Sequence, residues 1–165
     1  MSRIRAWAAQ AAGQPLAPFD YDPGPLAADD VEVAVENCGL CHSDLSVLNN
    51  EWMNSVYPVV PGHEIVGRIV AVGSQVRHLR VGQRVGVGWA SDSCMHCHSC
   101  MSGDHNLCNQ TQAVIIGHHG GFAERVRSHA AWAIPLPDGL DAASAGPLLC
   151  GGVTVFTPFV EFDVK

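Results

Sequence analysis

Short runs of alternating or β-branched hydrophobic residues recur along the chain, separated by glycine and proline. In Val31-Glu32-Val33-Ala34-Val35-Glu36 the three valines fall on one face of an extended strand. A longer β-branched run covers Ile65 to Val72. Shorter candidate strands are Arg5 to Ala9, Phe19 to Tyr21, Arg84 to Val87, Phe122 to Arg127 and Ala131 to Ile134. This pattern predicts a mainly β fold with short helices, built as a closed or partly closed antiparallel β-barrel.

Helical patterns are few and short. Ser43 and Asp44 are suited to cap a helix that continues from Leu45 to Leu48. Asp141 is suited to cap a second helical turn at Ala142 to Ala145. Both helices are too short to form the main layer of the fold.

A longer apolar run follows Pro147. Leu148 to Phe162 predicts a helix with Cys150 near its start. The segment 86–91 begins a Gly-x-Gly-x-x-Gly pattern and then departs from it. We therefore expect no βαβ unit for dinucleotide binding within this chain.

Length and charge limit the classes of function. The 165 residues fit one domain, and a formal net charge of -7 argues against a nucleic-acid partner. No apolar run reaches the ~18 residues of a membrane span, so we expect no membrane partner. Four of the seven cysteines lie between positions 94 and 108. Clustered thiols indicate a reduced, cytoplasmic compartment and metal binding rather than a disulfide scaffold.

The four clustered cysteines have the spacing Cys94-x2-Cys97-x2-Cys100-x7-Cys108, within a polar loop at about 91–112. Four thiolates that converge from so short a segment are typical of a closed, tetrahedral zinc site. The loop has few apolar residues of its own. We therefore expect the metal to stabilise its fold.

The residues of this loop are also compatible with two alternatives to a zinc site with four sulfur ligands. The first three cysteines also resemble a ferredoxin-type iron–sulfur sequence, but that pattern continues with x3-Cys-Pro. Here seven residues intervene and Asn109 follows the last cysteine. His96, His98 and His105 lie in the same loop and could replace one sulfur. We favour zinc held by four sulfurs.

A second set of candidate ligands is widely spaced. A turn places His63 and Glu64 side by side before the β-branched run, where a buried polar pair is costly unless something uses it. Cys41 and Cys150 lie far from them in the sequence. Two sulfurs and one nitrogen form the Cys2His set of a catalytic zinc site, with a fourth position that Glu64 could fill at rest. We expect the helix N-terminus to favour the Cys150 thiolate. Each of these could instead be an ordinary buried residue, as we expect for Cys38.

Four motifs in order carry a family resemblance. They are CGLCHSDL at 38–45, YPVVPGHEIVG at 57–67, the cysteine cluster, and LCGGVTV at 149–155. The chain resembles the zinc-dependent medium-chain alcohol dehydrogenases, and among them the cinnamyl alcohol dehydrogenase type. The resemblance covers the front portion of that family. It implies a GroES-like catalytic domain over 1–165, a structural zinc lobe at about 91–112, and the start of an inter-domain helix at about 148–162. The dinucleotide-binding domain of the family is absent from these residues.

The resemblance also implies roles for single residues. Ser43 corresponds to the proton-relay hydroxyl, His42 to a position near the cofactor pyrophosphate, and Thr154 to a position near the nicotinamide. The subgroup often has a histidine where this chain has Ser46, and Glu51 could supply a carboxylate there. Two zinc ions per chain are implied, a catalytic one at Cys41, His63, Glu64 and Cys150, and a structural one at Cys94, Cys97, Cys100 and Cys108.

The implied activity of the intact enzyme is interconversion of a small alcohol and an aldehyde, with hydride exchanged with NADP or NAD. Trp52, Met53 and Trp89 could line a pocket for aromatic or apolar aldehydes, although ordinary packing accounts for them equally well. We expect the 165 residues alone to turn over little alcohol, and the apolar helix at 153–162 to promote self-association. The alternative is a non-enzymatic, zinc-stabilised barrel or partner-binding module.

Overall fold

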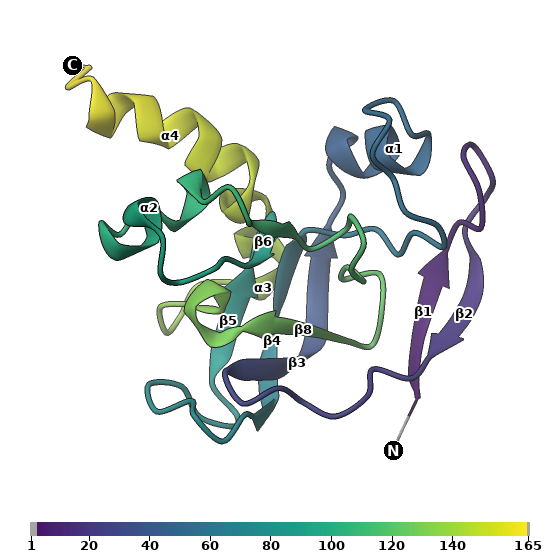
Figure 1. Cartoon of the computed structure of the whole chain (residues 1–165), viewed down its shortest axis with the longest axis horizontal. Helices are drawn as coiled ribbons and strands as arrows, with labels where there is room; N and C mark the ends of the chain where they lie inside the picture. Colours follow the sequence, from purple (N-terminus) through teal and green to yellow (C-terminus); the bar gives the residue numbers. More distant parts are fainter. Residues whose placement is uncertain (1–2, 165) are drawn as a thin grey trace.

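The computed structural model describes residues 3–164, and an antiparallel five-stranded sheet lies at its centre (Figure 1). The strand order is β8-β3-β4-β5-β9. The bounds are Asp30–Gly39 for β3, Glu64–Val72 for β4, Arg84–Val87 for β5, Arg125–His129 for β8 and Ile134–Pro135 for β9. Val31 and Val33 are fully buried, as the alternation in the sequence predicts.

The hydrophobic core includes the elements that carry the candidate ligands. Val47 lies in the helix that follows Cys41, and Val59 and Ile65 lie on either side of His63 in the sequence. All three are buried in the main core together with Val31, Val33, Ile69, Val85, Val87, Val114, Ile115 and Val126. Burial of these apolar side chains therefore fixes the loops on which the ligands lie.

Two ribbons flank the sheet. β1 (Ile4–Ala8) pairs with β2 (Ala17–Tyr21), and β6 (Ala90–Asp92) pairs with β7 (Gln112–Ala113). Single bridges, from Ala9 to Val59 and from Ala6 to Ala123, connect β1 to the rest of the fold. The mainly β architecture with short helices is as the sequence predicts.

Two predicted strands are displaced. The segment predicted at 122–127 becomes β8 only from Arg125, because Phe122 instead hydrogen-bonds to Pro61 and accepts a bond from Trp7 of β1. The strand predicted at 131–134 is wrong. That stretch is the 3₁₀ helix η2 (Ala130–Trp132), with β9 after it. The ring of His129 accepts a hydrogen bond from the Ala131 N–H at 3.1 Å, which caps the turn.

The short helices begin near the predicted caps. α1 spans His42–Leu48 with Cys41 as its N-cap, earlier than Ser43. Asp44 lies one turn inside the helix and accepts a hydrogen bond from the Cys41 N–H at 3.0 Å. α3 spans Ala142–Ala145, and Asp141 caps it as predicted by accepting from the Ser144 N–H at 3.0 Å.

The last helix, α4, spans Gly151–Glu161 and so begins three residues later than predicted. Residues Gly146–Leu149 form the 3₁₀ helix η3, in which Pro147 occupies the first turn. Cys150, between η3 and α4, has non-helical angles (φ -128°, ψ -85°). Because of this break, the backbone direction at Cys150 differs from that of α4, and the Cys150 side chain does not lie on a face of that helix.

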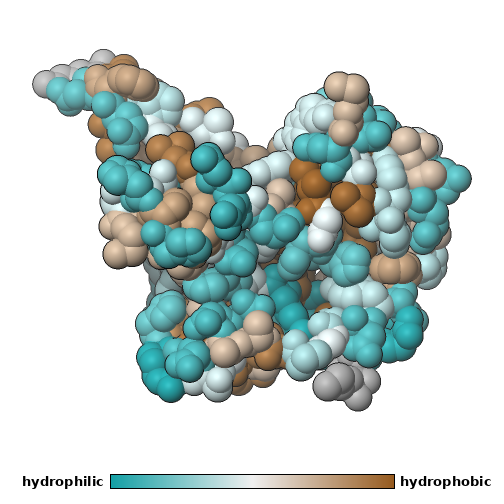
Figure 2. Space-filling model, in the orientation of Figure 1, coloured by the Kyte–Doolittle hydropathy of each residue, from teal (hydrophilic) through white to brown (hydrophobic). Residues whose placement is uncertain are grey.

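The cysteine-rich lobe contains α2 (His98–Met101) and the 3₁₀ helix η1 (His105–Leu107). The lobe and α4 lie on one side of the molecule, and α1 with the β1–β2 ribbon lies on the other (Figure 1). Figure 2 shows a hollow between the two sides.

None of the helices in residues 3–164 is, alone, long and apolar enough to cross a membrane. Taken together, the bent pair Ala142–Leu149 and Gly151–Glu161 meets the length and composition requirement, with a bend of 56°.

Candidate metal centres

Three separate parts of the chain bring one set of donor atoms together. We call Cys41, His63, Glu64 and Cys150 the distributed centre, since one donor atom from each lies within 4.8 Å of all the others. The sulfurs of Cys41 and Cys150 are 3.9 Å apart, and His63 Nε2 is 3.3 Å from the Cys150 sulfur. Two zinc–sulfur bonds of ~2.3 Å at a tetrahedral angle separate the sulfurs by about 3.8 Å. The donor set therefore fits a zinc ion.

Asp44 orients the histidine of this centre. It is fully buried, and its Oδ1 lies 3.0 Å from His63 Nδ1 and accepts from the Gly62 N–H at 2.8 Å. Its other oxygen accepts from the Cys41 N–H. Because the carboxylate faces Nδ1, that nitrogen carries the proton and Nε2 is left as the ligand atom.

Sequence reasoning assigned Asp44 only to a helix cap. Its position three residues after Cys41 was the available signal, because one helical turn places the two residues together. The carboxylate thus links the cysteine motif to the histidine motif through a single buried side chain.

Gly39 provides the space for Glu64. The two residues face each other across the β3–β4 pair. A Cβ at position 39 would lie 2.0 Å from Glu64 Oε2 and 3.0 Å from its Cβ. Any larger residue at 39 would therefore displace the carboxylate from the distributed centre.

Two glycines of the β5 region bring Cys150 to the centre. A Cβ at Gly86 would lie 2.6 Å from the Leu149 side chain, and a Cβ at Gly88 would lie 2.7 Å from the Leu149 carbonyl oxygen. These are the glycines that begin the incomplete dinucleotide-type pattern in the sequence. Their structural role is to let the residue before Cys150 pack directly on the sheet.

Negative charge is concentrated in the distributed centre. Burial, the hydrogen bond with Cys41 and the charges of Cys41 and Glu64 together raise the pKa of Cys150 to about 11. None of these causes is a contribution of the helix N-terminus, so the expectation that it favours the Cys150 thiolate stays a prediction. Burial also opposes ionisation of Cys41, but hydrogen bonds with Ser43, Cys150 and His63 together outweigh it and lower the Cys41 pKa. A cation would relieve this crowding of like charges.

The pKa of His63 is raised. Burial alone would lower it, but the hydrogen bond and the charge of Asp44 outweigh burial. The imidazole and the carboxylate therefore form a buried pair, with both side chains inaccessible to solvent. Such a pair holds the ring in one orientation.

The second set of donors lies in the lobe. We call Cys94, Cys97, Cys100 and Cys108 the lobe centre, in which the four sulfurs all lie within 4.8 Å of one another. The sulfurs of Cys94 and Cys100 are 4.0 Å apart. These distances fit a tetrahedral four-sulfur zinc site.

Backbone N–H groups support two of the lobe sulfurs. Cys94 accepts from the Cys97 N–H and Cys108 from the Gln110 N–H, each at 3.3 Å. Backbone hydrogen bonds lower the pKa of Cys108 to about 6, whereas burial raises that of Cys100 to about 11. Backbone N–H groups of the lobe thus stabilise the Cys108 thiolate without the help of a charged side chain.

The fold matches a known family. Residues 27–138 match the alcohol dehydrogenase GroES-like domain family. The chain belongs to this family. Members of the family use zinc and NAD(P).

Several relatives of the GroES-like domain family are alcohol or aldehyde oxidoreductases. An aldehyde reductase of Synechocystis is 56% identical over 98% of this chain and 48% of its own length. Among solved structures, a cinnamyl alcohol dehydrogenase from Sorghum bicolor has a TM-score of 0.93 at 36% identity, and the match covers 98% of this chain and 48% of that one. A Helicobacter pylori homologue solved with NADP(H) has a TM-score of 0.93 at 27% identity, with coverages of 99% and 50%.

The chain spans about half the length of the curated relatives that it matches. The resemblance to the cinnamyl alcohol dehydrogenase type, drawn from the four motifs, is confirmed by these relatives. The GroES-like fold class is confirmed as well.

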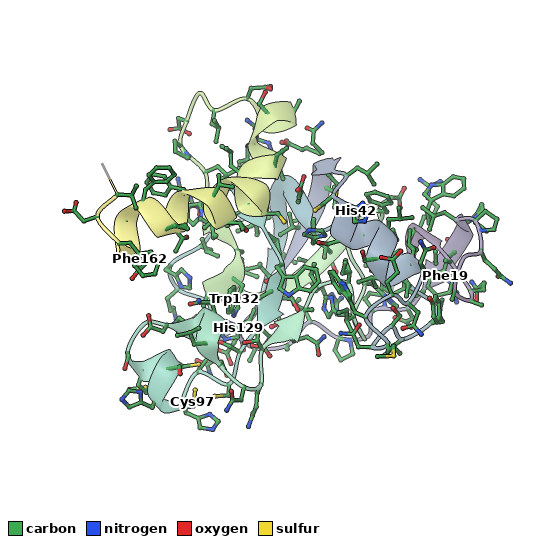
Figure 3. The ribbon with its side chains drawn as sticks, turned by 90° about the horizontal axis from the view of Figure 1, so that it is seen from above. Phe19, His42, Cys97, His129, Trp132 and Phe162 are labelled. Carbon is green, nitrogen blue, oxygen red and sulfur yellow. The ribbon has the colours of Figure 1, made fainter. Side chains whose placement is uncertain are left out.

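The positions corresponding to the family's relay and cofactor residues are accessible. Ser43 is partly buried beside Cys41, and His42 is exposed at the start of α1 (labelled in Figure 3). Thr154 is exposed on α4, where its hydroxyl donates to the Cys150 carbonyl at 2.7 Å. Ser43 hydrogen-bonds to the Cys41 thiol of the distributed centre, whereas Thr154 reaches only the backbone of Cys150.

Ser46 and Glu51 form a hydrogen-bonded pair. The buried Ser46 hydroxyl donates to Glu51 Oε2 at 2.7 Å, and Asn49 donates to the other oxygen at 3.2 Å. These bonds, Ser46 first, lower the pKa of the exposed Glu51 carboxyl. A carboxylate therefore lies next to the position where the subgroup often has a histidine.

One of the three proposed pocket residues, Trp89, lies against the distributed centre, and Trp52 packs on it. The Trp89 ring meets the His63 ring edge to face, with centroids 5.2 Å apart. Trp52 meets Trp89 in the same manner at 5.9 Å. Met53 is 87% exposed, so it does not form an enclosed wall within this chain.

The remaining cysteine and the lobe histidines lie outside both donor sets. Cys38 packs against the main core, and burial raises its pKa to about 12. Among the described residues, neither group of convergent donors includes Cys38, His96, His98 or His105. The structure therefore favours four sulfurs over a set in which histidine replaces one.

Proposed function

We propose that the chain is the catalytic-domain portion of a zinc-dependent, NAD(P)-linked alcohol dehydrogenase or aldehyde reductase. The distributed centre carries this proposal, because its donors converge from three separate elements and include an acidic residue as well as two sulfurs and one imidazole. A structural site has four permanent ligands, whereas a catalytic site keeps one exchangeable position. The lobe centre is of the first kind and the distributed centre of the second.

Each donor has a role in this proposal. Cys41, His63 and Cys150 hold the catalytic zinc, and Glu64 is the exchangeable fourth ligand. When bound, zinc supplies Lewis acidity toward the substrate oxygen, and the nicotinamide supplies or accepts hydride. The four lobe cysteines hold the structural zinc.

The chain's own hydroxyls provide a path for the substrate proton. Ser43, beside Cys41, accepts the proton from the substrate hydroxyl at its Oγ while its own hydroxyl proton passes outward to the next acceptor of the chain. Ser46 and the Glu51 carboxylate lie farther along the same helix–turn segment and are already joined by a hydrogen bond. Because Glu51 is exposed, it can release the proton to solvent.

Substrate class follows from the aromatic side chains. Trp52 and Trp89 form an apolar wall that begins at the His63 ring. Such a wall favours aromatic or apolar aldehydes and the corresponding alcohols. On the cofactor side, His42 is proposed to contact the pyrophosphate and Thr154 the nicotinamide.

Metal analysis of the purified 165-residue chain tests the proposal. Two zinc ions per chain are expected, and Cys41→Ser should remove one of them while the fold is retained. One zinc in the wild-type chain, unchanged by Cys41→Ser, would support the alternative of a barrel stabilised only by the lobe metal. Cofactor-dependent alcohol oxidation by these residues alone should be weak, because the described residues include no βαβ unit.

The last helix supports a second part of the proposal. None of the described residues of α4 is buried. Its apolar side chains are each more than half exposed, namely Val153, Val155, Phe156, Phe159 and Val160. In the isolated chain this face should cause self-association. Sedimentation velocity of the wild type against a Phe156→Ser/Phe159→Ser variant tests it, and equal monomer fractions would contradict it.

A further inference from the structure

One hydroxyl lies between the lobe centre and the body of the domain. Ser93 follows β6, is 4% exposed, and precedes the first lobe cysteine by one position. Its Oγ lies 3.7 Å from the sulfur of Cys100, which is equally buried. Ser93 therefore contacts a proposed metal ligand without being a ligand itself.

Trp132 fixes the direction of the hydrogen bonds at Ser93. The indole nitrogen of Trp132, in η2 on the body of the domain, donates to Ser93 Oγ at 3.3 Å. Figure 3 shows Trp132 beside the base of the lobe that carries Cys97. An indole N–H can only donate, so the serine oxygen is the acceptor in this bond. The single proton of Ser93 remains available for another group.

Three atoms compete for that proton. They are the Cys100 sulfur at 3.7 Å, the Met95 sulfur at 3.6 Å and His105 Nδ1 at 3.5 Å. A thioether is a weak acceptor, and His105 Nδ1 can donate to the second lone pair of the serine oxygen instead. A metal-bound cysteine is a thiolate, whose negative charge makes it the strongest acceptor of the three.

We infer that Ser93 is a positioning residue of the lobe centre: its hydroxyl donates to the Cys100 thiolate, and Trp132 holds that hydroxyl from the body of the domain. The inference rests on the proposed zinc at the lobe centre. Two residues outside the cysteine motif, Ser93 and Trp132, then hold the buried Cys100 sulfur in position. This arrangement also makes metal affinity in the lobe depend on the packing of η2.

The test uses the 165-residue chain loaded with cobalt, whose absorption reports on thiolate ligands. Ser93→Ala should lower lobe affinity about 10- to 100-fold in competition with a chelator. The thiolate-to-cobalt band should move to longer wavelength, because the sulfur loses a hydrogen bond. The lobe spectrum is obtained by subtracting that of Cys97→Ser, which reports the distributed centre alone. Ser93→Thr, which keeps the hydroxyl, should restore most of the affinity.

Two further variants separate hydroxyl donation from general packing. Trp132→Phe keeps the ring but removes the N–H, and should cost about fivefold in lobe affinity. Ser91→Ala is the matched control, because Ser91 is a buried serine of β6 whose hydroxyl donates to the Gln112 carbonyl. Its band and affinity should equal those of the wild type.

The outcomes are distinct. Wild-type affinity and an unshifted band in Ser93→Ala would overturn the inference while leaving the proposed function intact. If the wild-type lobe bound no metal at all, the proposed structural zinc itself would fail. A Ser93→Ala chain that lost all lobe metal but kept the distributed-centre spectrum would support the inference, provided that Ser93→Thr regained it.

Discussion

The two metal centres are built in opposite ways. The lobe centre takes all its donors from residues 94–108, and backbone N–H groups of the same loop support them. The distributed centre takes its donors from positions 41, 63, 64 and 150, which meet only when α1, β4 and η3 are packed on the core. One centre is local in sequence, and the other is a product of the whole fold.

This difference predicts a different dependence on metal. The lobe contributes little to the main core, so bound metal must provide much of its folding free energy. The distributed donors are held by the buried Asp44 and by close glycine contacts before any ion arrives. Metal should therefore order the lobe, whereas the fold should order the distributed centre.

The largest expected effect is loss of the lobe. Cys97→Ser removes one of four ligands, and the lobe should release its metal and unfold locally. Metal analysis should fall from about two zinc ions per chain to about one, and limited proteolysis should cut within 91–112. Retention of two ions and a protease-resistant lobe would show that the two centres are equally dependent on the fold.

A nearly equal effect should follow from loss of Asp44. Asp44→Ala leaves two backbone N–H groups and the His63 ring without their buried partner. The metal-free chain should lose about 3–5 kcal/mol of stability, measured by urea unfolding. Asp138→Ala, at an exposed turn, is the control and should behave as wild type. Equal urea midpoints for the two variants would show that Asp44 does not organise the distributed centre.

A smaller and more selective effect is expected at Gly39. Gly39→Ala places a methyl group where the Glu64 carboxylate lies, so affinity at the distributed centre should change about tenfold. Lobe affinity should not change. Gly151→Ala is the matched control, because a Cβ there meets nothing within 4 Å. Chelator competition on both variants measures the difference.

The smallest effect concerns the segment that carries Cys150. The Ser144 hydrogen bond lowers the pKa of Asp141 below its ordinary value of 3.8. A depressed pKa in the folded state means that the cap stabilises above that value and is lost as the pH falls through the folded pKa. The melting-temperature difference between wild type and Asp141→Ala should therefore be constant near neutrality and vanish in acid. A difference that persisted at the lowest pH would contradict this assignment.

The sequence predicted those parts of the structure that depend on local patterns. The alternating valines of β3, the β-branched β4, the Asp141 cap and the clustered lobe sulfurs all follow from spacing within a few residues. The donors of the distributed centre were identified because His63 and Glu64 form an unusual pair before a buried strand. Their meeting with Cys41 and Cys150 required the family resemblance.

Other features depend on neighbours that are distant in the sequence. The role of Asp44 depends on His63, that of Gly39 on Glu64 across a strand pair, and that of Gly86 on Leu149. The strand predicted at 131–134 is replaced by η2 because the His129 ring caps a turn. Hydrophobic periodicity reports which face is buried, but it does not report which residue lies opposite.

The placement of the tryptophans makes the two centres separately observable. Trp89 touches the His63 ring, and Trp132 touches Ser93 beside the lobe sulfurs. The other two indoles are Trp7, which is about half exposed, and Trp52. If Trp7, Trp52 and one of the other two tryptophans were replaced by phenylalanine, the remaining Trp89 or Trp132 would report by its fluorescence on one centre alone. Rapid-mixing fluorescence could then time the arrival of each ion and reveal which of the two centres fills first.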